Sequence, residues 1–196
     1  MLHARKRLGQ HFLHDPAVID RLVETIAPKP KDNIVEIGSG RGALTLPLLQ
    51  TVEVLHAIEL DERMADHLIE VAPDPERLIL HRADALEFDF TSLAYAPGTL
   101  RIVGNLPYNI TAPLLFHCLD HAHSIDRAVV MVQREVARRL VAGPGCKEYG
   151  LLTVLVAMRA ETDLRLQVDR RSFRPIPAVD SAVVELRFAA GPRFAV

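Results

Sequence analysis

The chain has 196 residues, of which 49% are hydrophobic and 24% charged, and these values indicate one soluble globular domain with enough chain for a core. A net charge of −2 argues against a general nucleic-acid-binding protein, which is usually basic. We expect neither membrane insertion nor export. No run approaches about 18 consecutive apolar residues, and the basic N-terminus lacks the apolar core of a signal peptide.

The charges are distributed unevenly along the chain. Residues 1–14 contain three Lys or Arg and no acid, and residues 53–89 contain eleven acids against three Lys or Arg. Residues 127–196 contain twelve Lys or Arg against seven acids. This pattern fits either one positive face on an acidic body or simply solvated faces. The two cysteines, Cys118 and Cys146, fit a reducing cytoplasm and lack a zinc-ligand spacing, so we expect no metal site.

The first part of the chain alternates between short apolar runs and amphipathic segments. A basic arm, 1–14, ends at Asp15 and Pro16, a capping residue followed by the proline that favours the first helical turn. Later helices are predicted to begin near Leu44, Asp61 and Thr111. Strands are predicted over residues 33–37, 52–58, 78–81, 100–104 and 128–132. This alternation with short connections predicts a parallel sheet covered on both faces.

After Gln133 the pattern changes. A helix is predicted over 134–142, whereas 149–158 fits either a helix or a strand. Residues 163–168 and 181–188 alternate as strands, and we expect them to form a terminal antiparallel hairpin pair on one edge of the sheet. The sequence therefore predicts an α/β fold with a mostly parallel, seven-stranded sheet.

A glycine loop follows the first predicted strand. Gly38, Gly40 and Gly42 permit a ligand to approach the backbone closely. Glu59, about twenty residues past the loop at the end of the second strand, can accept hydrogen bonds from both hydroxyls of a ribose. The same spacing, with Ala43 in the third glycine place, also fits the dinucleotide fingerprint. The loop alone leaves NAD and S-adenosylmethionine (SAM) as alternatives.

Polar residues at the next two strand ends favour SAM. Asp84 follows the third strand, where it can accept from an adenine amino group, and Asn105-Leu106-Pro107-Tyr108 follows the fourth. The Asn105 side-chain oxygen and a backbone carbonyl, assigned to Pro107, can accept the two hydrogens of an exocyclic amino group. Tyr108 can stack on the ring that carries it. Because open α/β sheets bind ligands at the carboxyl ends of their strands, we expect these groups to share one site.

Longer motifs extend over essentially the whole chain. They are the arm segment 7–13, the glycine loop 36–42, Glu59, Asp84, the segment 105–108, and the segments 133–137, 143–145 and 173–184. With these motifs the sequence resembles the KsgA-type family of small-subunit rRNA adenine N6-dimethyltransferases.

The resemblance implies a class I SAM-dependent methyltransferase (Rossmann-like) fold over 1–196, with SAM as cofactor. It also implies dimethylation of two adjacent adenosines near the 3′ end of small-subunit rRNA, late in subunit assembly. Carried over by position, the cofactor-binding residues are His11, Leu13, Gly38, Gly40, Glu59, Asp84 and Asn105. The implied catalytic residues are Asn105, Pro107, Tyr108 and Phe173, the last as a second stacking residue for the target base.

Two departures from the family pattern affect these expectations. Many members have Asn where this chain has His11, so a side-chain contact there would make cofactor affinity depend on pH. Members also continue into a small helical domain that helps to bind RNA, and we expect this chain to lack it. We expect SAM binding to survive without that domain and rRNA methylation to be weakened or lost.

We expect a cytoplasmic monomer whose partner is the rRNA of the pre-30S particle. Candidate phosphate contacts are the basic groups Arg5, Lys6, Arg7, Arg134, Arg138, Arg139, Lys147, Arg170, Arg171 and Arg174. Two alternatives remain open. One is a large-subunit rRNA adenine methyltransferase of the macrolide-resistance type, and the other is a non-catalytic ribosome-assembly factor that kept the fold.

Overall fold

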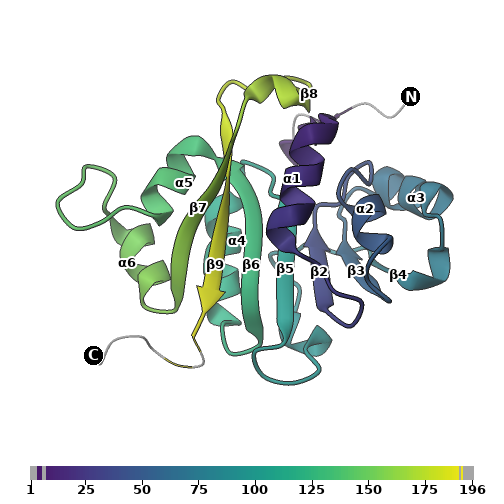
Figure 1. The fold of residues 1–196 in the computed structure, drawn as a ribbon, viewed down its shortest axis with the longest axis horizontal. Helices are drawn as coiled ribbons and strands as arrows, with labels where there is room; N and C mark the ends of the chain where they lie inside the picture. The colour runs from purple at the N-terminus through teal and green to yellow at the C-terminus, as the bar shows by residue number, and fades with distance from the viewer. Residues whose placement is uncertain (1–3, 6–7, 190, 192–196) are drawn as a thin grey trace.

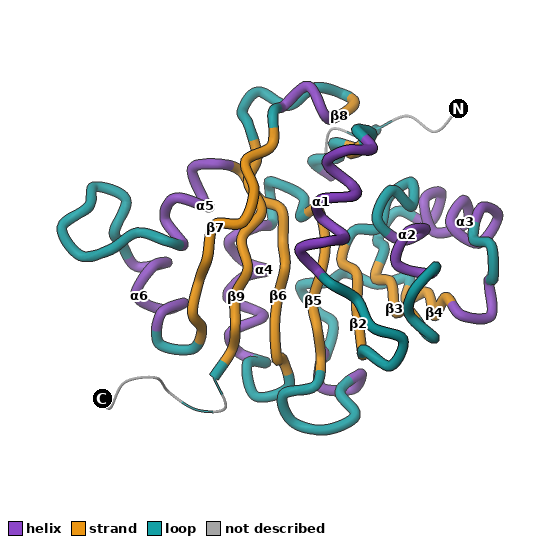
Figure 2. The backbone as a smooth tube through the Cα atoms, in the orientation of Figure 1, coloured by secondary structure: helices purple, strands orange, loops and turns teal. Residues whose placement is uncertain are grey.

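A seven-stranded sheet lies at the centre of the structure, a computed structural model that describes residues 4–5, 8–189 and 191 (Figures 1 and 2). The strand order is β4-β3-β2-β5-β6-β9-β7, with parallel pairing from β4 to β6 and antiparallel pairing of β9 with both β6 and β7. The strands are β2 (Asn33–Ile37), β3 (Leu55–Ile58), β4 (Leu78–His81), β5 (Leu100–Asn105), β6 (Ile125–Gln133), β7 (Ala160–Val168) and β9 (Ser181–Phe188). The predicted mostly parallel sheet with an antiparallel pair at one edge is confirmed.

Helices cover both faces of this sheet, and Figure 1 shows α1 in front of it and α4 behind it. One apolar cluster joins the sheet to α1 (Pro16–Ile26), α2 (Thr45–Leu49) and α3 (Glu62–Val71). The other joins it to α4 (Thr111–Asp120), α5 (Arg134–Leu140) and α6 (Leu151–Ala157). The segment 149–158, whose sequence allowed either a helix or a strand, is therefore mainly helical. Short 3-10 helices are η2 (Pro75–Arg77), η3 (Phe90–Leu93) and η4 (Arg170–Ser172).

The central strand β2 is buried on both faces because helices cover both faces of the sheet. In β2, Ile34 packs in the cluster of α1–α3 and its neighbour Val35 packs in the cluster of α4–α6. All five residues of β2 are buried. Its mainly apolar sequence lacks the regular polar alternation of a half-exposed strand, and its two polar residues, Asn33 and Glu36, are buried as well.

The predicted start of α1 is confirmed by its cap. The Asp15 carboxylate accepts a hydrogen bond from the Ala17 N–H (3.1 Å), and Pro16 occupies the first turn. The helix ends at Ala27, which adopts a left-handed conformation with φ of 47° and donates its N–H to the Val23 carbonyl. The cap therefore fixes where the chain turns from the arm into α1.

A second, two-stranded sheet joins the arm to a segment near the other end of the sequence. β1 (Phe12–Leu13) pairs antiparallel with β8 (Phe173–Arg174). The His14 N–H continues the pairing by donating to the Ser172 carbonyl (3.0 Å). Figure 1 shows β8 and the start of α1 beyond one end of the central strands. Lys6 and Arg7 lie outside the described residues.

None of the helices in the described part of the chain is both long enough and apolar enough to cross a membrane.

Candidate active site

A cavity of about 140 Å³ opens at the carboxyl ends of the parallel strands. Its walls come from the arm, the glycine loop and the segments that follow β3, β4 and β5. The lining includes nine of the ten predicted site residues, namely His11, Leu13, Gly38, Gly40, Glu59, Asp84, Asn105, Pro107 and Tyr108. Phe173 is not part of this lining. The geometry thus gathers the predicted residues, while their roles stay predictions.

The arm lies directly on the glycine loop. Gly38 and Gly40 have φ values of 72° and 54°, a conformation that favours glycine. A Cβ atom added at Gly40 would lie 3.2 Å from the Phe12 ring, so the absence of a side chain lets β1 approach. The Arg41 guanidinium lies 4.4 Å from the centroid of the same ring. The arm and the glycine loop therefore form adjacent walls of the cavity.

The Glu59 carboxylate lines the cavity beside the glycine loop. Its two oxygens accept hydrogen bonds from the Gly40 N–H (2.8 Å) and the Asp61 N–H (2.9 Å). Burial raises the pKa of Glu59, and these backbone hydrogen bonds oppose the rise. A carboxylate offers about four acceptor positions, so two remain for the hydroxyls of a ribose.

Ser39 supplies a second sign that the loop is built for a ligand. Its Oγ is buried and has no hydrogen-bond partner among the described residues, although the residue lines the cavity. A buried hydroxyl without a partner is unfavourable unless a ligand or water completes it. Together with the glycine loop and Glu59, it fits a polar, ribose-containing cofactor such as SAM.

Asp61, which sequence reasoning treated only as a helix start, ties the arm to the cavity wall. Its side chain is fully buried and accepts from Gln10 Nε2 (3.1 Å) and Arg63 Nη2 (2.7 Å), and Arg5 lies 3.4 Å away. The pKa of Asp61 is lowered, chiefly by the hydrogen bond from Arg63. Gln10 also accepts from the Arg5 N–H (2.8 Å). Gln10 and Asp61 are 51 residues apart, so no local sequence signal pointed to this contact.

Asp84 lines the cavity just after the end of β4. One carboxylate oxygen accepts from the Leu86 N–H (2.9 Å), which fixes the side chain in its own turn. Its second oxygen has no hydrogen-bond partner among the described residues. It can therefore accept from an amino group in the cavity.

Asn105 is held by the arm through its amide nitrogen. Nδ2 donates to the His11 carbonyl (2.9 Å), which leaves the amide oxygen as an acceptor for a ligand. The His11 side chain has a different role: Nδ1 lies 2.8 Å from the Pro175 carbonyl oxygen, and the ring centroid lies 5.3 Å from that of Tyr108. Asn105 thus contacts the backbone of His11, whereas the His11 imidazole contacts Pro175 and Tyr108.

The carbonyl of Pro107 is a poor second acceptor because it already has two donors. It accepts from the Ile110 N–H (3.2 Å) and from Thr111 Oγ1 (3.0 Å). Leu106 also lines the cavity, and its carbonyl has no donor among the described residues. Leu106 is therefore the better candidate for the second acceptor, and this role stays a prediction.

The two predicted stacking residues differ in placement. Tyr108 lines the cavity, and its hydroxyl lies 2.6 Å from Ser181 Oγ. Phe173 is 0% exposed and belongs to the core cluster that contains Leu13 and Leu22. A base cannot stack on a ring that is enclosed in the core, so we do not carry Phe173 into the proposed mechanism.

Glu36, beneath the glycine loop, is a buried acid with an unusual proton affinity. Burial raises its pKa to about 7, the hydrogen bond from Thr45 Oγ1 (2.6 Å) opposes the rise, and the nearby Glu59 adds to it. The folded protein therefore holds this proton more tightly than the unfolded chain does. The resulting stability is complete below the unfolded pKa, near 4.5, and is lost as the pH rises towards 7.

Replacing Glu36 by Gln is expected to raise the free energy of unfolding at pH 8 by roughly 2–3 kcal/mol, since it removes the buried charge. At pH 4.5 the difference in the free energy of unfolding should be small, because Glu36 in the folded parent is then protonated and neutral, as Gln is. Urea titrations from pH 4.5 to 8 measure this difference. The exposed pair of Glu135 with Arg139 supplies the control Glu135→Gln, which should leave the pH profile unchanged. Parallel profiles for Glu36→Gln and the parent would contradict the buried-acid explanation.

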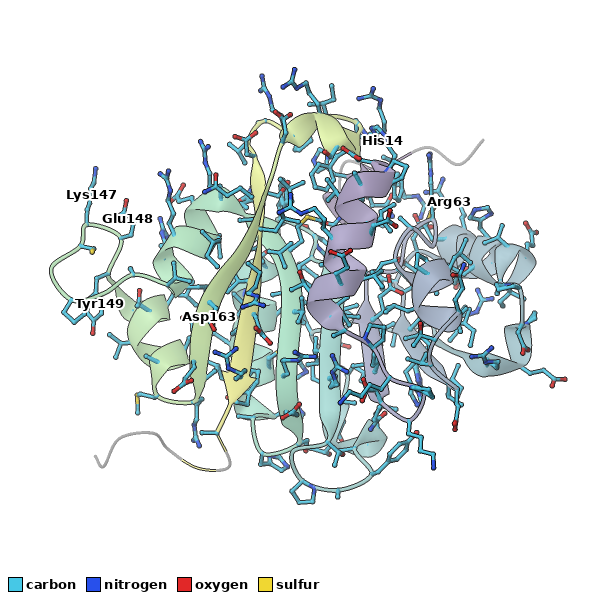
Figure 3. All side chains as sticks on the ribbon, in the orientation of Figure 1. His14, Arg63, Lys147, Glu148, Tyr149 and Asp163 are labelled. Atoms are coloured by element: carbon cyan, nitrogen blue, oxygen red, sulfur yellow. The ribbon has the colours of Figure 1, made fainter. Side chains whose placement is uncertain are left out.

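Most of the basic groups proposed for phosphate contacts occur on segments around the carboxyl edge. Several already have acidic neighbours, as in the pairs Arg134–Asp180 (3.0 Å) and Arg171–Asp169 (2.9 Å). Figure 3 shows Lys147 projecting from the loop between α5 and α6. These exposed pairs are weak and can exchange partners.

The family model described as "Ribosomal RNA adenine dimethylase" matches residues 1–193. The chain belongs to the ribosomal RNA adenine dimethylase family. Two relatives, both named "Ribosomal RNA small subunit methyltransferase A", support the assignment. The protein of Alcanivorax borkumensis is 47% identical over 182 residues, covering 93% of this chain and 65% of the relative. That of Nitrosococcus oceani is 51% identical over 183 residues, covering 93% and 69%.

Solved structures of dimethylase relatives share the fold. A dimethyladenosine transferase from Plasmodium falciparum has a TM-score of 0.79 and 32% identity, covering 91% of this chain and 64% of that one. The 23S rRNA methyltransferase ErmE has a TM-score of 0.80 and 32% identity, covering 94% and 72%. The fold is therefore that of a class I SAM-dependent methyltransferase. In the described part of this dimethylase-family chain, no three His, Cys, Asp or Glu side chains are grouped to hold a metal ion.

Proposed function

We propose that residues 1–196 form one catalytic domain that dimethylates N6 of two adjacent adenosines near the 3′ end of small-subunit rRNA. The observation that carries the proposal is the amide oxygen of Asn105, which has no donor among the described residues and belongs to the cavity that also contains the glycine loop and Glu59. The names of the relatives at 47% and 51% identity support the small subunit as the source of the substrate. The partner is then the pre-30S particle, met in the cytoplasm by a monomer of this chain.

The cofactor is SAM, which supplies an electrophilic methyl group when bound. Backbone groups of Gly38 and Gly40 would lie against it, and the unpartnered Ser39 hydroxyl would gain a partner. Glu59 would accept from the ribose hydroxyls, and Asp84 from the adenine amino group. His11 and Leu13 would close over it from the arm.

The chemical problem is the low nucleophilicity of an adenine amino nitrogen, whose lone pair is delocalised into the ring. The Asn105 side-chain oxygen and the Leu106 carbonyl accept the two N6 hydrogens. These hydrogen bonds favour a pyramidal nitrogen with an available lone pair, and their preorganised dipoles need no rearrangement during transfer. The bond from Asn105 Nδ2 to the His11 carbonyl holds the amide in the required orientation. No strong base is needed beforehand, since the nitrogen becomes acidic as it is methylated.

The target adenosine must leave its stack to reach the cavity. Tyr108 stabilises the extruded base by stacking, an interaction worth about 1–3 kcal/mol for each base. Its ring is available for this role because it lines the cavity, in contrast to the ring of Phe173.

The test is transfer of a radiolabelled methyl group from SAM to ribosomal subunits that lack the modification. We expect label on adenine N6 in small-subunit rRNA and none in large subunits. Label in large subunits alone would favour 23S rRNA methylation, the activity for which ErmE is named. Calorimetric titration with SAM, with NAD as control, separates a failure of RNA use from a failure of cofactor binding. A chain that binds SAM but labels neither subunit would support the assembly-factor alternative.

A further inference from the structure

The Tyr108 ring depends for its orientation on a residue outside the cavity lining. The phenol oxygen lies 2.6 Å from Ser181 Oγ, close enough for a strong hydrogen bond in which either group is the donor. Ser181 is fully buried, and the described residues give its hydroxyl no other hydrogen-bond partner. Among the described residues, the buried Ser181 hydroxyl therefore depends on the phenol for its hydrogen bond.

Ser181 lies in the seven-stranded sheet, whereas Tyr108 lies in a loop. Ser181 is the first residue of β9 and pairs with Gln133 of β6 on one side and with Val168 of β7 on the other. Tyr108 follows β5 in a turn that ends where α4 begins. The hydrogen bond thus links the Tyr108 ring, in a loop, to β9, which is paired on both sides. The His11 ring of the arm lies 5.3 Å from the Tyr108 ring and restricts its movement from another side.

We propose that Ser181 is a positioning residue, which holds the Tyr108 ring in the orientation in which the extruded adenine stacks. This inference rests on the proposed function, since it needs a base in the cavity. Ser181 touches neither cofactor nor base and acts only through the phenol. Sequence reasoning had treated it as an ordinary strand residue.

The test compares four proteins: the parent, Ser181→Ala, Tyr108→Phe and the double variant. We expect each single variant to lower kcat/KM for small-subunit rRNA roughly tenfold, while KM for SAM changes less than twofold. The double variant should be no worse than either single one, because all three lack the same hydrogen bond. Independent losses that multiply would overturn the inference, as would a Ser181→Ala protein with the activity of the parent. Thr162→Val is the matched control, because it removes a hydroxyl from the neighbouring β7 that donates elsewhere, to the Leu140 carbonyl (2.9 Å).

A second measurement needs no activity. The chain has three tyrosines and no tryptophan, so ultraviolet absorbance follows phenol ionisation cleanly. Burial raises the pKa of Tyr108 and the Ser181 hydrogen bond lowers it, whereas Tyr95 is 72% exposed. Ser181→Ala should therefore move the latest phenol transition to higher pH, and Tyr108→Phe should remove that transition. An unchanged transition in Ser181→Ala would overturn the inference. A parent that binds SAM but transfers no methyl group would instead overturn the proposed function, and the inference with it.

Discussion

Replacing Asn105 by Ala is expected to lower kcat for methyl transfer by about 10²–10³-fold, the usual effect of removing a preorganised polar group from a transition state. The alanine side chain cannot accept a hydrogen from N6. It also loses the hydrogen bond to the His11 carbonyl, so SAM binding should weaken through the arm, though much less than transfer does. Single-turnover transfer to small subunits and calorimetric SAM binding measure the two effects separately.

Asn105→Asp separates the two roles of the amide. Aspartate keeps an acceptor oxygen but cannot donate to the His11 carbonyl, so both variants lose the arm contact and only Asn105→Ala loses the acceptor. We expect similar SAM affinities for the two variants and faster transfer by Asn105→Asp. Transfer by Asn105→Ala at the rate of the parent would contradict the mechanism.

Replacing Gly104 by Ala is expected to destabilise the protein by at least about 3 kcal/mol. A Cβ atom at this position would lie 2.4 Å from the Ile37 carbonyl oxygen, a backbone atom of the adjacent strand. Neither β2 nor β5 can yield easily, because both are central in the sheet. Urea unfolding measures the loss. Since Gly104 directly precedes Asn105, SAM binding should also weaken at concentrations of urea that leave the parent intact.

Two other glycines provide graded controls for this prediction. Gly98 has a φ of 64° but open space around an added Cβ, so Gly98→Ala should cost only about 1 kcal/mol from backbone strain. Gly143 has open space and no left-handed φ, so Gly143→Ala should be near neutral. Equal effects at all three positions would show that the close approach of β2 and β5 is not the cause.

The sequence predicted two strands with the bounds that the structure has, because both are short and mainly apolar. The segments 33–37 and 78–81 coincide with the central strand β2 and the edge strand β4. The predicted strand 52–58 begins only at Leu55, because the Glu53 N–H donates to the Pro30 carbonyl (2.8 Å), in the connection between α1 and β2, and not to a neighbouring strand. The pairing of β1 with β8 was not predicted, since two-residue strands carry no periodicity.

For the site, the sequence predicted which side chains gather but not how they are held. Residues after successive parallel strands meet at one edge for topological reasons, so the placement of Glu59, Asp84 and Asn105 followed from the strand order. The available carbonyl at Leu106 depends on hydrogen bonds made elsewhere in the turn, which composition does not encode. The inward direction of the Phe173 ring likewise depends on tertiary packing and not on residue type.

The pairing of β1 with β8 affects when, during folding, the cofactor site is completed. His11 and Pro175, which meet beside the cavity, are 164 residues apart in the sequence. Closing so long a loop is entropically costly and comes late in folding, after local helices and neighbouring strands have formed. During synthesis, the glycine loop emerges early. The arm that covers it cannot pair through β1 with β8 until the segment around Phe173 has left the ribosome. A nascent chain therefore exposes an open cofactor site, and SAM should act as a late ligand that favours the finished molecule over its partly folded precursors.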